Sequence, residues 1–278
     1  MSQSFGELIR AAAKKLASAG IADASREARL LMAHAAEIPR DRIVLMSDDI
    51  AKNSIKMKFE DIVSDRSRRV PLSHITGTRA FYEHDFIVTP DVLDPRPETE
   101  TLVQEALKLP FQNVLDLGTG SGAILLSLLA ARKDVSGIGT DVSPAALDVA
   151  RQNAQSIGVT DRAMFLYSSW FDSVEGKFDL IVSNPPYIAS EEMSELEPEL
   201  TYEPRIALTD EADGLTCYRE ITSHASTFLK SSGHLLVEIG YRQSLAVTEM
   251  FKSAGFVDVR VVHDIDARDR VIVGKPPT

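Results

Sequence analysis

Apolar residues in the first part of the chain recur at helical spacing. One face of the first segment carries Phe5, Leu8, Ile9, Ala12 and Leu16. Ser4 and Glu7 form the pattern of a capping box at the start of this segment. Similar spacing follows after Ser25 and over residues 53–65, without the alternation that is typical of strands. We therefore expect a small helical bundle over residues 1–66.

The pattern changes further along the chain. Residues 67–95 are expected to form a connector with a β-hairpin, because short apolar runs flank a polar turn. Beyond residue 96, strands are expected over residues 113–117, 135–141, 163–167, 178–183, 234–239, 256–262 and 270–273. Helices are expected over residues 121–132, 144–156, 215–230 and 244–254. This alternation predicts a doubly wound, mostly parallel α/β sheet over residues 96–278, with ligands at the carboxyl ends of its strands.

Composition and charge narrow the class of protein. The 278 residues are 44% hydrophobic and 26% charged, which is typical of globular proteins and excludes wholesale disorder. The longest apolar stretch, residues 124–131, is far shorter than the ~20 residues that span a bilayer, so no membrane association is expected. Cys217 is the single cysteine, which fits a cytoplasmic protein without internal disulfides. The net charge of −11 argues against a broad surface for nucleic-acid phosphates.

A glycine-rich loop follows the first expected strand of the sheet. The strand ends near Asp116, and glycines stand at 118, 120 and 122, where they allow a tight turn and close approach to a ligand. The spacing also satisfies a dinucleotide fingerprint, but a carboxylate at Asp116 would repel a pyrophosphate and suits an ammonium group. Asp141 ends the second strand, where a carboxylate can accept both hydroxyls of a ribose. These features favour S-adenosylmethionine, which has an adenosine and an ammonium group but no phosphate.

A second motif stands at the carboxyl end of the expected strand 178–183. It consists of Asn184, Pro185, Pro186 and Tyr187. The side-chain oxygen of Asn184 and the carbonyl of Pro185 can accept the two hydrogens of a planar NH₂ group, and Tyr187 offers a flat face to a conjugated amide or base. Acceptors aimed at those hydrogens stabilise the positive charge that develops on the nitrogen during methyl transfer. The motif therefore predicts methylation of a planar nitrogen without a strong general base.

Longer motifs accompany these two. They read DFIVTPDVLDPRPETE, VLDLGTGSGAI, FDLIVSNPPYI, YEPRIAL, DGLTCYREI, LLVEIGYRQ and DRVIVG. In these motifs the chain resembles the N5-glutamine methyltransferases of peptide chain release factors, most strongly over residues 86–274. The resemblance implies a Rossmann-like, seven-stranded, S-adenosylmethionine-dependent methyltransferase domain preceded by a small helical domain. It also implies methylation of the glutamine in the Gly-Gly-Gln motif of release factors, with S-adenosylhomocysteine as the other product.

The resemblance assigns roles to individual residues. Together with Asp116, the cofactor would be held by Gly118, Thr119, Gly120, Ser121, Gly122, Asp141, Trp170 and Asn184. The substrate glutamine would be held by Asn184, Pro185, Pro186 and Tyr187, of which Asn184, Pro185 and Tyr187 would take part in catalysis. Trp170 would lie near the adenine. Ser169, which precedes it, would accept the hydrogen bond of the adenine amino group that an acidic residue accepts in the family.

Other functions remain open. The tetrapeptide also occurs in enzymes that methylate exocyclic amines of nucleic acids (adenine N6 or guanine N2), and a non-catalytic cofactor-binding scaffold is a third possibility. The net charge and the lack of a basic recognition domain favour a protein substrate, without direct contact to nucleic acid. We expect the helical bundle to recognise release factors and the protein to be a monomer. The scattered histidines lack ligand spacing, so no metal site is expected.

Two charged clusters remain. Between residues 188 and 204 stand six acids without Lys or Arg: Glu191, Glu192, Glu195, Glu197, Glu199 and Glu203. They indicate either a solvated loop or an acidic lid that faces a basic protein. The basic cluster consists of Arg66, Arg68, Arg69 and Arg79, which we expect to pair with nearby acids.

Overall fold

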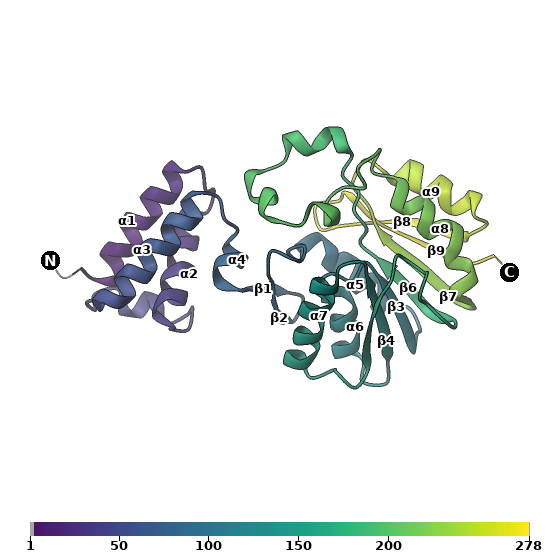
Figure 1. Ribbon diagram of the computed structural model, residues 1–278, viewed down its shortest axis with the longest axis horizontal. Helices are drawn as coiled ribbons and strands as arrows, with labels where there is room; N and C mark the ends of the chain where they lie inside the picture. Colours follow the sequence, from purple (N-terminus) through teal and green to yellow (C-terminus); the bar gives the residue numbers. More distant parts are fainter. Residues whose placement is uncertain (1–2, 278) are drawn as a thin grey trace. The chain divides into compact units, whose positions relative to one another are not determined.

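The computed structural model describes residues 3–277. The chain divides into two compact units (Figure 1). The first, the helical unit, comprises the described residues up to Gly77 together with residues 197–202. The second, the sheet unit, comprises residues 78–196 and the described residues from Glu203 onward.

The helical unit forms from the periodic segments of the N-terminal region. It contains α1 (Phe5–Ser18), α2 (Ala24–Ala36), η1 (Ile43–Met46), α3 (Asn53–Ser67) and α4 (Leu72–Thr76), and η4 (Pro198–Tyr202) joins them from far along the chain. The expected apolar face of α1 is buried in the core of the unit. The capping box is confirmed, since the backbone N–H of Glu7 donates to the Ser4 hydroxyl and that of Ser4 donates to the Glu7 carboxylate. Residues 67–77, which the sequence assigned to the connector, cluster with these helices.

The sheet unit is built on a seven-stranded sheet within the described residues 3–277, as the predicted fold class requires. Its strand order is β5 (Ala163–Tyr167), β4 (Ser136–Asp141), β3 (Asn113–Leu117), β6 (Phe178–Ser183), β7 (Leu229–Glu238), β9 (Asp269–Lys275) and β8 (Val257–His263). The first five of these strands pair in parallel, whereas β9 runs antiparallel to both β7 and β8. The order reverses beside β3, so the loops after β3, β4 and β6 lie at a topological switch point, where doubly wound folds bind ligands.

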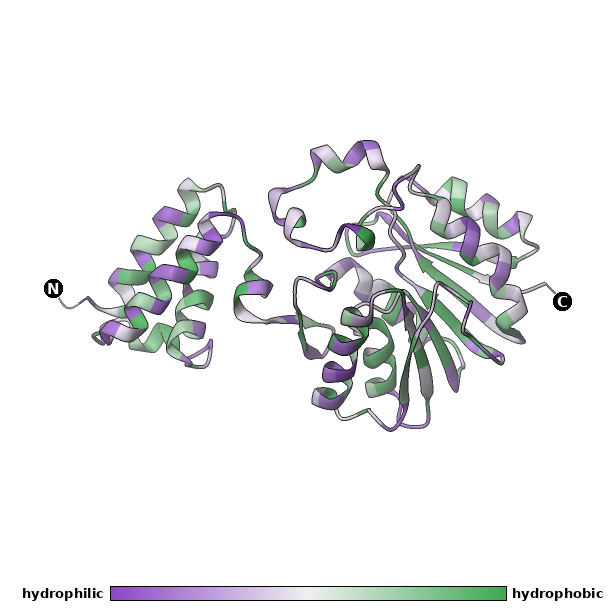
Figure 2. Ribbon diagram, viewed as in Figure 1, coloured by the Kyte–Doolittle hydropathy of each residue, from purple (hydrophilic) through white to green (hydrophobic). Residues whose placement is uncertain are grey.

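Helices cover both faces of this sheet (Figure 1). On one face lie α5 (Glu100–Leu107), α6 (Ala123–Ala131) and α7 (Pro144–Ile157), and on the other lie α8 (Thr216–Phe228) and α9 (Ser244–Ser253). Alternate residues of a strand enter opposite cores: Val114 of β3 packs in the first core and Leu115 in the second. The central strands are therefore apolar on both sides, as Figure 2 shows. Residues 229–233, expected to be partly helical, belong to β7 because Leu229 pairs with Phe178.

A hairpin leads into the sheet unit. Its strands are β1 (Thr78–Phe81) and β2 (His84–Ile87), close to the expected positions. Phe81 and Phe86 are buried edge to face, with ring centroids 5.9 Å apart, in the core that contains α5 and α6. The Asn153 side chain of α7 also exchanges two hydrogen bonds with the backbone of Ile87. The hairpin is therefore anchored to the sheet unit.

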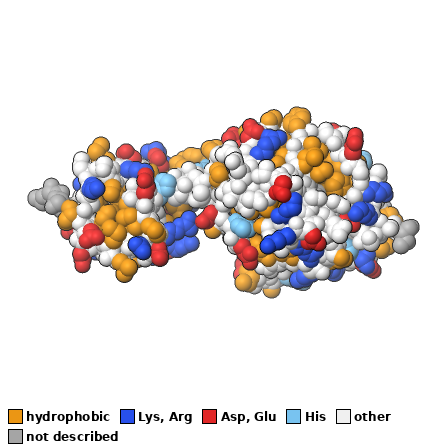
Figure 3. Space-filling view, turned by 90° about the horizontal axis from the view of Figure 1, so that it is seen from below, with side chains coloured by type: hydrophobic (Ala, Val, Ile, Leu, Met, Phe, Trp, Pro, Cys, Tyr) orange, Lys and Arg blue, Asp and Glu red, His pale blue; other side chains and the backbone are white. Residues whose placement is uncertain are grey.

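Charges of both signs are interspersed on the surface. On the face drawn in Figure 3, Lys and Arg side chains alternate with Asp and Glu side chains. The expected pairing of the basic cluster is confirmed, since Arg66 and Arg69 pair with Glu199, Arg68 with Asp65, and Arg79 with Asp94. The cluster is therefore not a patch of free positive charge.

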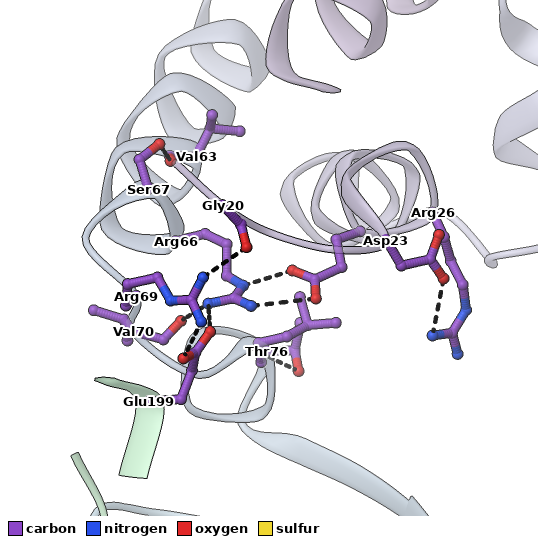
Figure 4. A network of polar contacts seen from close by, with 12 residues as sticks. Gly20, Asp23, Arg26, Val63, Arg66, Ser67, Arg69, Val70, Thr76 and Glu199 are labelled. Atoms are coloured by element: carbon purple, nitrogen blue, oxygen red, sulfur yellow. Dashed lines mark hydrogen bonds and ion pairs between the residues drawn. The ribbon is translucent and has the colours of Figure 1, made fainter. Parts of the chain in front are cut away.

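Arg66 organises the helical unit (Figure 4). Its buried guanidinium donates to Glu27 of α2 (2.5 Å), to the carbonyl of Val70 (3.2 Å) and to Glu199 of η4 (3.0 Å). Arg69 reaches the other oxygen of Glu199 at 2.6 Å. These contacts hold residues 197–202 in the helical unit. Glu199 belongs to the acidic segment that was considered as a possible lid. Its carboxylate is instead paired with two arginines of the helical unit.

Candidate functional site: a cavity at the carboxyl ends of the central strands

The glycine-rich loop connects β3 to α6. Gly118, Gly120 and Gly122 all adopt positive φ, between 54° and 81°, which side-chain-bearing residues rarely adopt. A Cβ atom at Gly118 or Gly120 would meet no atom of the described residues within 4 Å, so the loop backbone is bare on that side. The N–H of Thr119 donates to the carbonyl of Thr140 (2.8 Å), which ties the loop to the end of β4. The turn therefore exposes backbone at the start of a helix, as the sequence predicted.

Asp116 lies beneath this loop. It is fully buried, and its Oδ2 accepts a hydrogen bond from the Thr119 hydroxyl at 2.7 Å. Its Oδ1 has no hydrogen-bond partner among residues 3–277. Burial raises the pKa of Asp116 to about 7, against the opposing hydrogen bond from Thr119. A buried carboxylate with a free acceptor attracts a cation above it.

Asp141 faces the ligand edge of the sheet. Its Oδ2 accepts from the backbone N–H of Gly120 (2.9 Å) and its Oδ1 from that of Ser143 (2.9 Å). Burial raises the pKa of Asp141, while these backbone donors oppose the rise. Each oxygen keeps acceptor capacity for a hydroxyl, because a carboxylate oxygen can accept more than one hydrogen bond. The geometry suits a ribose.

Trp170 follows β5 in a strained turn. Its φ is +45°, which is unfavourable for a bulky aromatic residue. The buried hydroxyl of Ser168 stabilises the turn by donating to the carbonyl of Trp170 (3.1 Å) and accepting from the N–H of Ser173 (3.0 Å). Ser169 is exposed and lines the cavity described below. Ser168 thus builds the turn, and Ser169 is available to a ligand.

The predicted amide-binding motif leaves the end of β6. Pro185 is buried, whereas Asn184, Pro186 and Tyr187 are half-buried. Asn184 donates from Nδ2 to the hydroxyl of Thr99 at 3.1 Å. Its Oδ1 remains an acceptor. Tyr187 packs on the second core, and burial raises the pKa of its hydroxyl to about 12.

These segments surround a cavity of about 630 Å³, a typical size for a small-molecule site. The predicted residues that line it are Gly118, Thr119, Gly120, Ser121, Asp141, Trp170, Asn184 and Pro186. Asp116, Gly122, Pro185 and Tyr187, which were also predicted, do not line it. The bare glycine backbone and the acceptors of Asp141 fit a ligand with a ribose. The buried carboxyl of Asp116 lies beneath the loop, where its field favours a positive charge on that ligand. These residues therefore suit S-adenosylmethionine.

Motifs distant in the sequence meet at the end of the tetrapeptide. The Nε2 of Gln243 donates to the carbonyls of Tyr187 (2.9 Å) and Gly214 (3.1 Å). Its Oε1 accepts from the N–H of Gly240 at 3.0 Å. Gly214 has φ +73°, and a Cβ there would lie 2.4 Å from the Tyr187 carbonyl oxygen. Gln243 and Gly214 thus determine the path of the backbone after the tetrapeptide.

Sequence reasoning missed an ion pair at the cavity wall. Arg96, which lines the cavity, donates to both carboxylate oxygens of buried Glu203, at 2.6 and 2.7 Å. Glu203 is therefore not part of an exposed acidic lid. Residues 204–207, which follow it directly, also line the cavity. Arg96 lies in the PRPETE motif and Glu203 in the YEPRIAL motif. Nothing in the sequence, however, indicates that two residues 107 positions apart form a pair.

The remaining features to consider are the single cysteine, possible metal ligands and possible membrane-spanning helices. Cys217 lines the cavity, but burial raises the pKa of its thiol to about 11, so it is a poor nucleophile at neutral pH. Within residues 3–277, no group of His, Cys, Asp or Glu side chains could hold a metal ion. Across the same residues, none of the helices has the length and apolar content needed to cross a membrane.

The chain is similar to known protein families and to known enzymes. Residues 7–77 match the PrmC N-terminal domain family, and residues 91–211 match the methyltransferase small domain family. The chain is 46% identical to the release factor glutamine methyltransferase of Cereibacter sphaeroides over 98% of both chains. It is 43% identical to the protein of that name from Caulobacter vibrioides, over 95% of this chain and 93% of that one. A solved methyltransferase from Pyrococcus furiosus is similar in fold, with a TM-score of 0.57, 16% identity and coverage of 77% of this chain and 99% of that one.

Proposed function

The chain belongs to the release factor glutamine methyltransferase family, and on that premise we propose its reaction. It transfers a methyl group from S-adenosylmethionine to the side-chain amide nitrogen, N5, of the glutamine in the Gly-Gly-Gln motif of peptide chain release factors. One observation carries the proposal: Asn184 lines the same cavity as the glycine loop and Asp141. A donor of methyl groups and a substrate amide can therefore meet in one cavity.

The residues around the loop hold the cofactor. Asp141 accepts the ribose hydroxyls, the bare backbone of Gly118 and Gly120 allows close approach, and Asp116 supplies negative charge beneath the loop. When bound, S-adenosylmethionine supplies an electrophilic methyl group on a positively charged sulfur. Trp170 and Ser169 lie at the wall expected to receive the adenine.

Asn184 acts on the substrate amide. Its Nδ2 is engaged by Thr99, so its Oδ1 is the atom that accepts an N–H of the glutamine side chain. This hydrogen bond holds the nitrogen in place and stabilises the positive charge that develops on it. The carbonyl of Pro185 is the second proposed acceptor, and Tyr187 is the proposed flat surface beside the amide. The extra proton of the methylated amide is acidic enough to leave without a strong base.

The test is mass spectrometry of release factors incubated with the enzyme and S-adenosylmethionine. We expect a mass increase of one methyl group on the Gly-Gly-Gln glutamine. Asn184→Ala should reduce turnover by about 10²-fold or more, with cofactor affinity nearly unchanged. Efficient labelling of DNA or RNA exocyclic amines, with release factors unlabelled, would instead support a nucleic-acid methyltransferase.

The helical unit is the proposed docking site for the release factor. Its described residues include no glycine loop and none of the residues that line the cavity. A chain that begins at Thr78, the first residue of the sheet unit, should keep its affinity for S-adenosylmethionine in calorimetry. The same chain should methylate intact release factors poorly. Wild-type turnover by this shortened chain would contradict the division of roles.

A further inference from the structure

Asn184 is held from behind by a residue of the PRPETE segment. Thr99 closes η2 (Pro97–Thr99) and is 4% exposed, so its hydroxyl is almost fully withdrawn from bulk water. It accepts a hydrogen bond from Nδ2 of Asn184 at 3.1 Å. An asparagine amide can present either its NH₂ or its oxygen to a hydroxyl, because a hydroxyl both donates and accepts. The observed orientation, with Nδ2 toward Thr99, therefore holds only while the Thr99 hydroxyl acts as the acceptor.

Glu238 restricts the direction in which the Thr99 hydroxyl can donate its hydrogen bond. It lies at the end of β7, is fully buried and approaches the Thr99 hydroxyl. Within the described part of the chain, neither carboxyl oxygen has a partner in good hydrogen-bond geometry, so both are available as acceptors. Burial raises the pKa of Glu238 to about 7, while Thr99, Arg270 and Arg96 favour its charged form and Glu98 opposes it. The hydroxyls of Tyr187 and Tyr218 also lie in its field. Once ionised, Glu238 can only accept a hydrogen bond.

This arrangement determines the direction in which the Thr99 hydroxyl donates its proton. A Thr99 hydroxyl that donates to Glu238 has only acceptor capacity left for Asn184. Asn184 must then turn its NH₂ toward Thr99 and its oxygen toward the cavity. An oxygen in that position accepts from an amide NH₂ and repels a carboxylate.

We propose that Thr99 and Glu238 are positioning residues that fix the orientation of the Asn184 amide. Glu238 orients the Thr99 hydroxyl, and Thr99 orients Asn184, so that the Asn184 oxygen meets the glutamine nitrogen. The inference rests on the proposed function, since it concerns how the same site recognises an amide. It assigns to Thr99 and Glu238 an effect on turnover that is separate from cofactor binding.

The experiment compares variants on intact release factor at pH 8, where Glu238 is ionised. Thr99→Val removes the hydroxyl at nearly constant volume and should lower kcat by about tenfold or more, because Asn184 loses its fixed orientation. Thr99→Ser keeps the hydroxyl and should recover most of that loss. Thr99→Ala provides a second variant if valine disturbs folding. Thr222→Val is the matched control, since buried Thr222 in α8 donates to the carbonyl of Tyr218.

A double-mutant cycle separates positioning from general destabilisation. Glu238→Gln should lower kcat in the wild-type background but change it little once Thr99 is valine, because Glu238 acts through the Thr99 hydroxyl. Calorimetric affinity for S-adenosylmethionine should stay within about twofold in every variant, since neither residue is assigned to the cofactor.

The outcomes distinguish a failure of the proposed function from a failure of the positioning inference alone. Wild-type enzyme that does not methylate release factors overturns the proposed function and this inference with it. Wild-type enzyme that does so, with normal kcat in Thr99→Val and Thr99→Ala, overturns the inference alone. Failure of Thr99→Ser to recover activity, or additive losses in the double mutant, also overturns it.

Discussion

At the scale of single residues, two aspartates on neighbouring strands take different roles because their surroundings differ. Asp116 is withdrawn from solvent beneath the loop and contacts it through the Thr119 hydroxyl. Asp141 faces the cavity and is held by two backbone N–H groups. The first thus places a carboxyl group beneath the glycine-rich loop, and the second presents carboxylate oxygens to the cavity.

The buried carboxyl of Asp116 should make stability depend on pH. Its pKa is about 7 in the folded protein against 3.8 without burial, so the folded state holds this proton more tightly than the unfolded state. Stability must then fall as pH rises from about 4 to 7, by at most about 4 kcal/mol. Asp116→Asn removes this dependence. Thermal unfolding without cofactor should show little difference between the variant and wild type at pH 4, and a more stable variant at pH 8. A constant difference across this range would contradict the assignment.

At the scale of elements, the position of the tetrapeptide depends on segments that follow it in the chain. Gly214 precedes α8 and contacts the Tyr187 backbone, and Gln243 precedes α9 and bonds to both. The Arg96–Glu203 pair similarly joins the PRPETE segment to the start of η5 (Arg205–Ala207). The cavity walls are therefore assembled from contacts between loops at one edge of the sheet.

Gly214→Ala should displace the tetrapeptide. The new Cβ would lie 2.4 Å from the Tyr187 carbonyl oxygen, at a φ of +73° that already disfavours alanine. We expect loss of at least about 1 kcal/mol of stability together with a large loss of turnover on release factors. Gly158→Ala is the matched control, because Gly158 has φ +81° and a methyl group there would meet no atom of the described residues within 4 Å. It should lose stability but keep turnover; equal turnover in the two variants would show that the Gly214 contact is unimportant.

At the scale of the whole molecule, the acidic segment after the tetrapeptide divides into two groups. Glu199 and Glu203 are engaged in ion pairs with arginines, so they do not contribute to an open acidic surface. Glu191, Glu192, Glu195 and Glu197 remain exposed. The first three belong to η3 (Ser190–Glu195) in the sheet unit, shortly after the tetrapeptide that begins at Asn184. Such acids attract a basic partner and repel phosphates.

Replacing Glu191, Glu192 and Glu195 by Gln should slow the capture of release factor, mainly through the association rate, at low ionic strength. The effect should fade as salt shortens the Debye length below ~8 Å. The control replaces exposed Asp134, Asp161 and Glu175 by their amides, which changes the net charge equally at the opposite edge of the sheet. Stopped-flow association rates provide the measurement. Equal slowing in both triple variants would mean that overall charge, rather than the acidic segment, governs capture.

Much of this protein could be predicted from local sequence. Helical spacing and the Ser4–Glu7 pair determined the start of the helical unit, and alternating strand and helix patterns determined a doubly wound sheet. Glycines before α6 and a carboxylate at the end of β4 predicted a cofactor site, because backbone freedom and strand-end position are local properties. The Asn184 tetrapeptide at a strand end predicted its chemistry in the same way, from residue types and a local position.

Tertiary structure alone decided which residues support that chemistry. Thr99 and Gln243 reach the tetrapeptide from other segments, and Glu238 lies near Thr99. Residues 197–202 join the helical unit through Arg66. Their pairings depend on strand order and on the burial of charge, which no periodic pattern encodes. Burial also separated the six acids of one loop into paired and exposed groups. Local sequence thus specifies elements and motifs, whereas the contacts that orient a reacting group arise only when distant segments pack together.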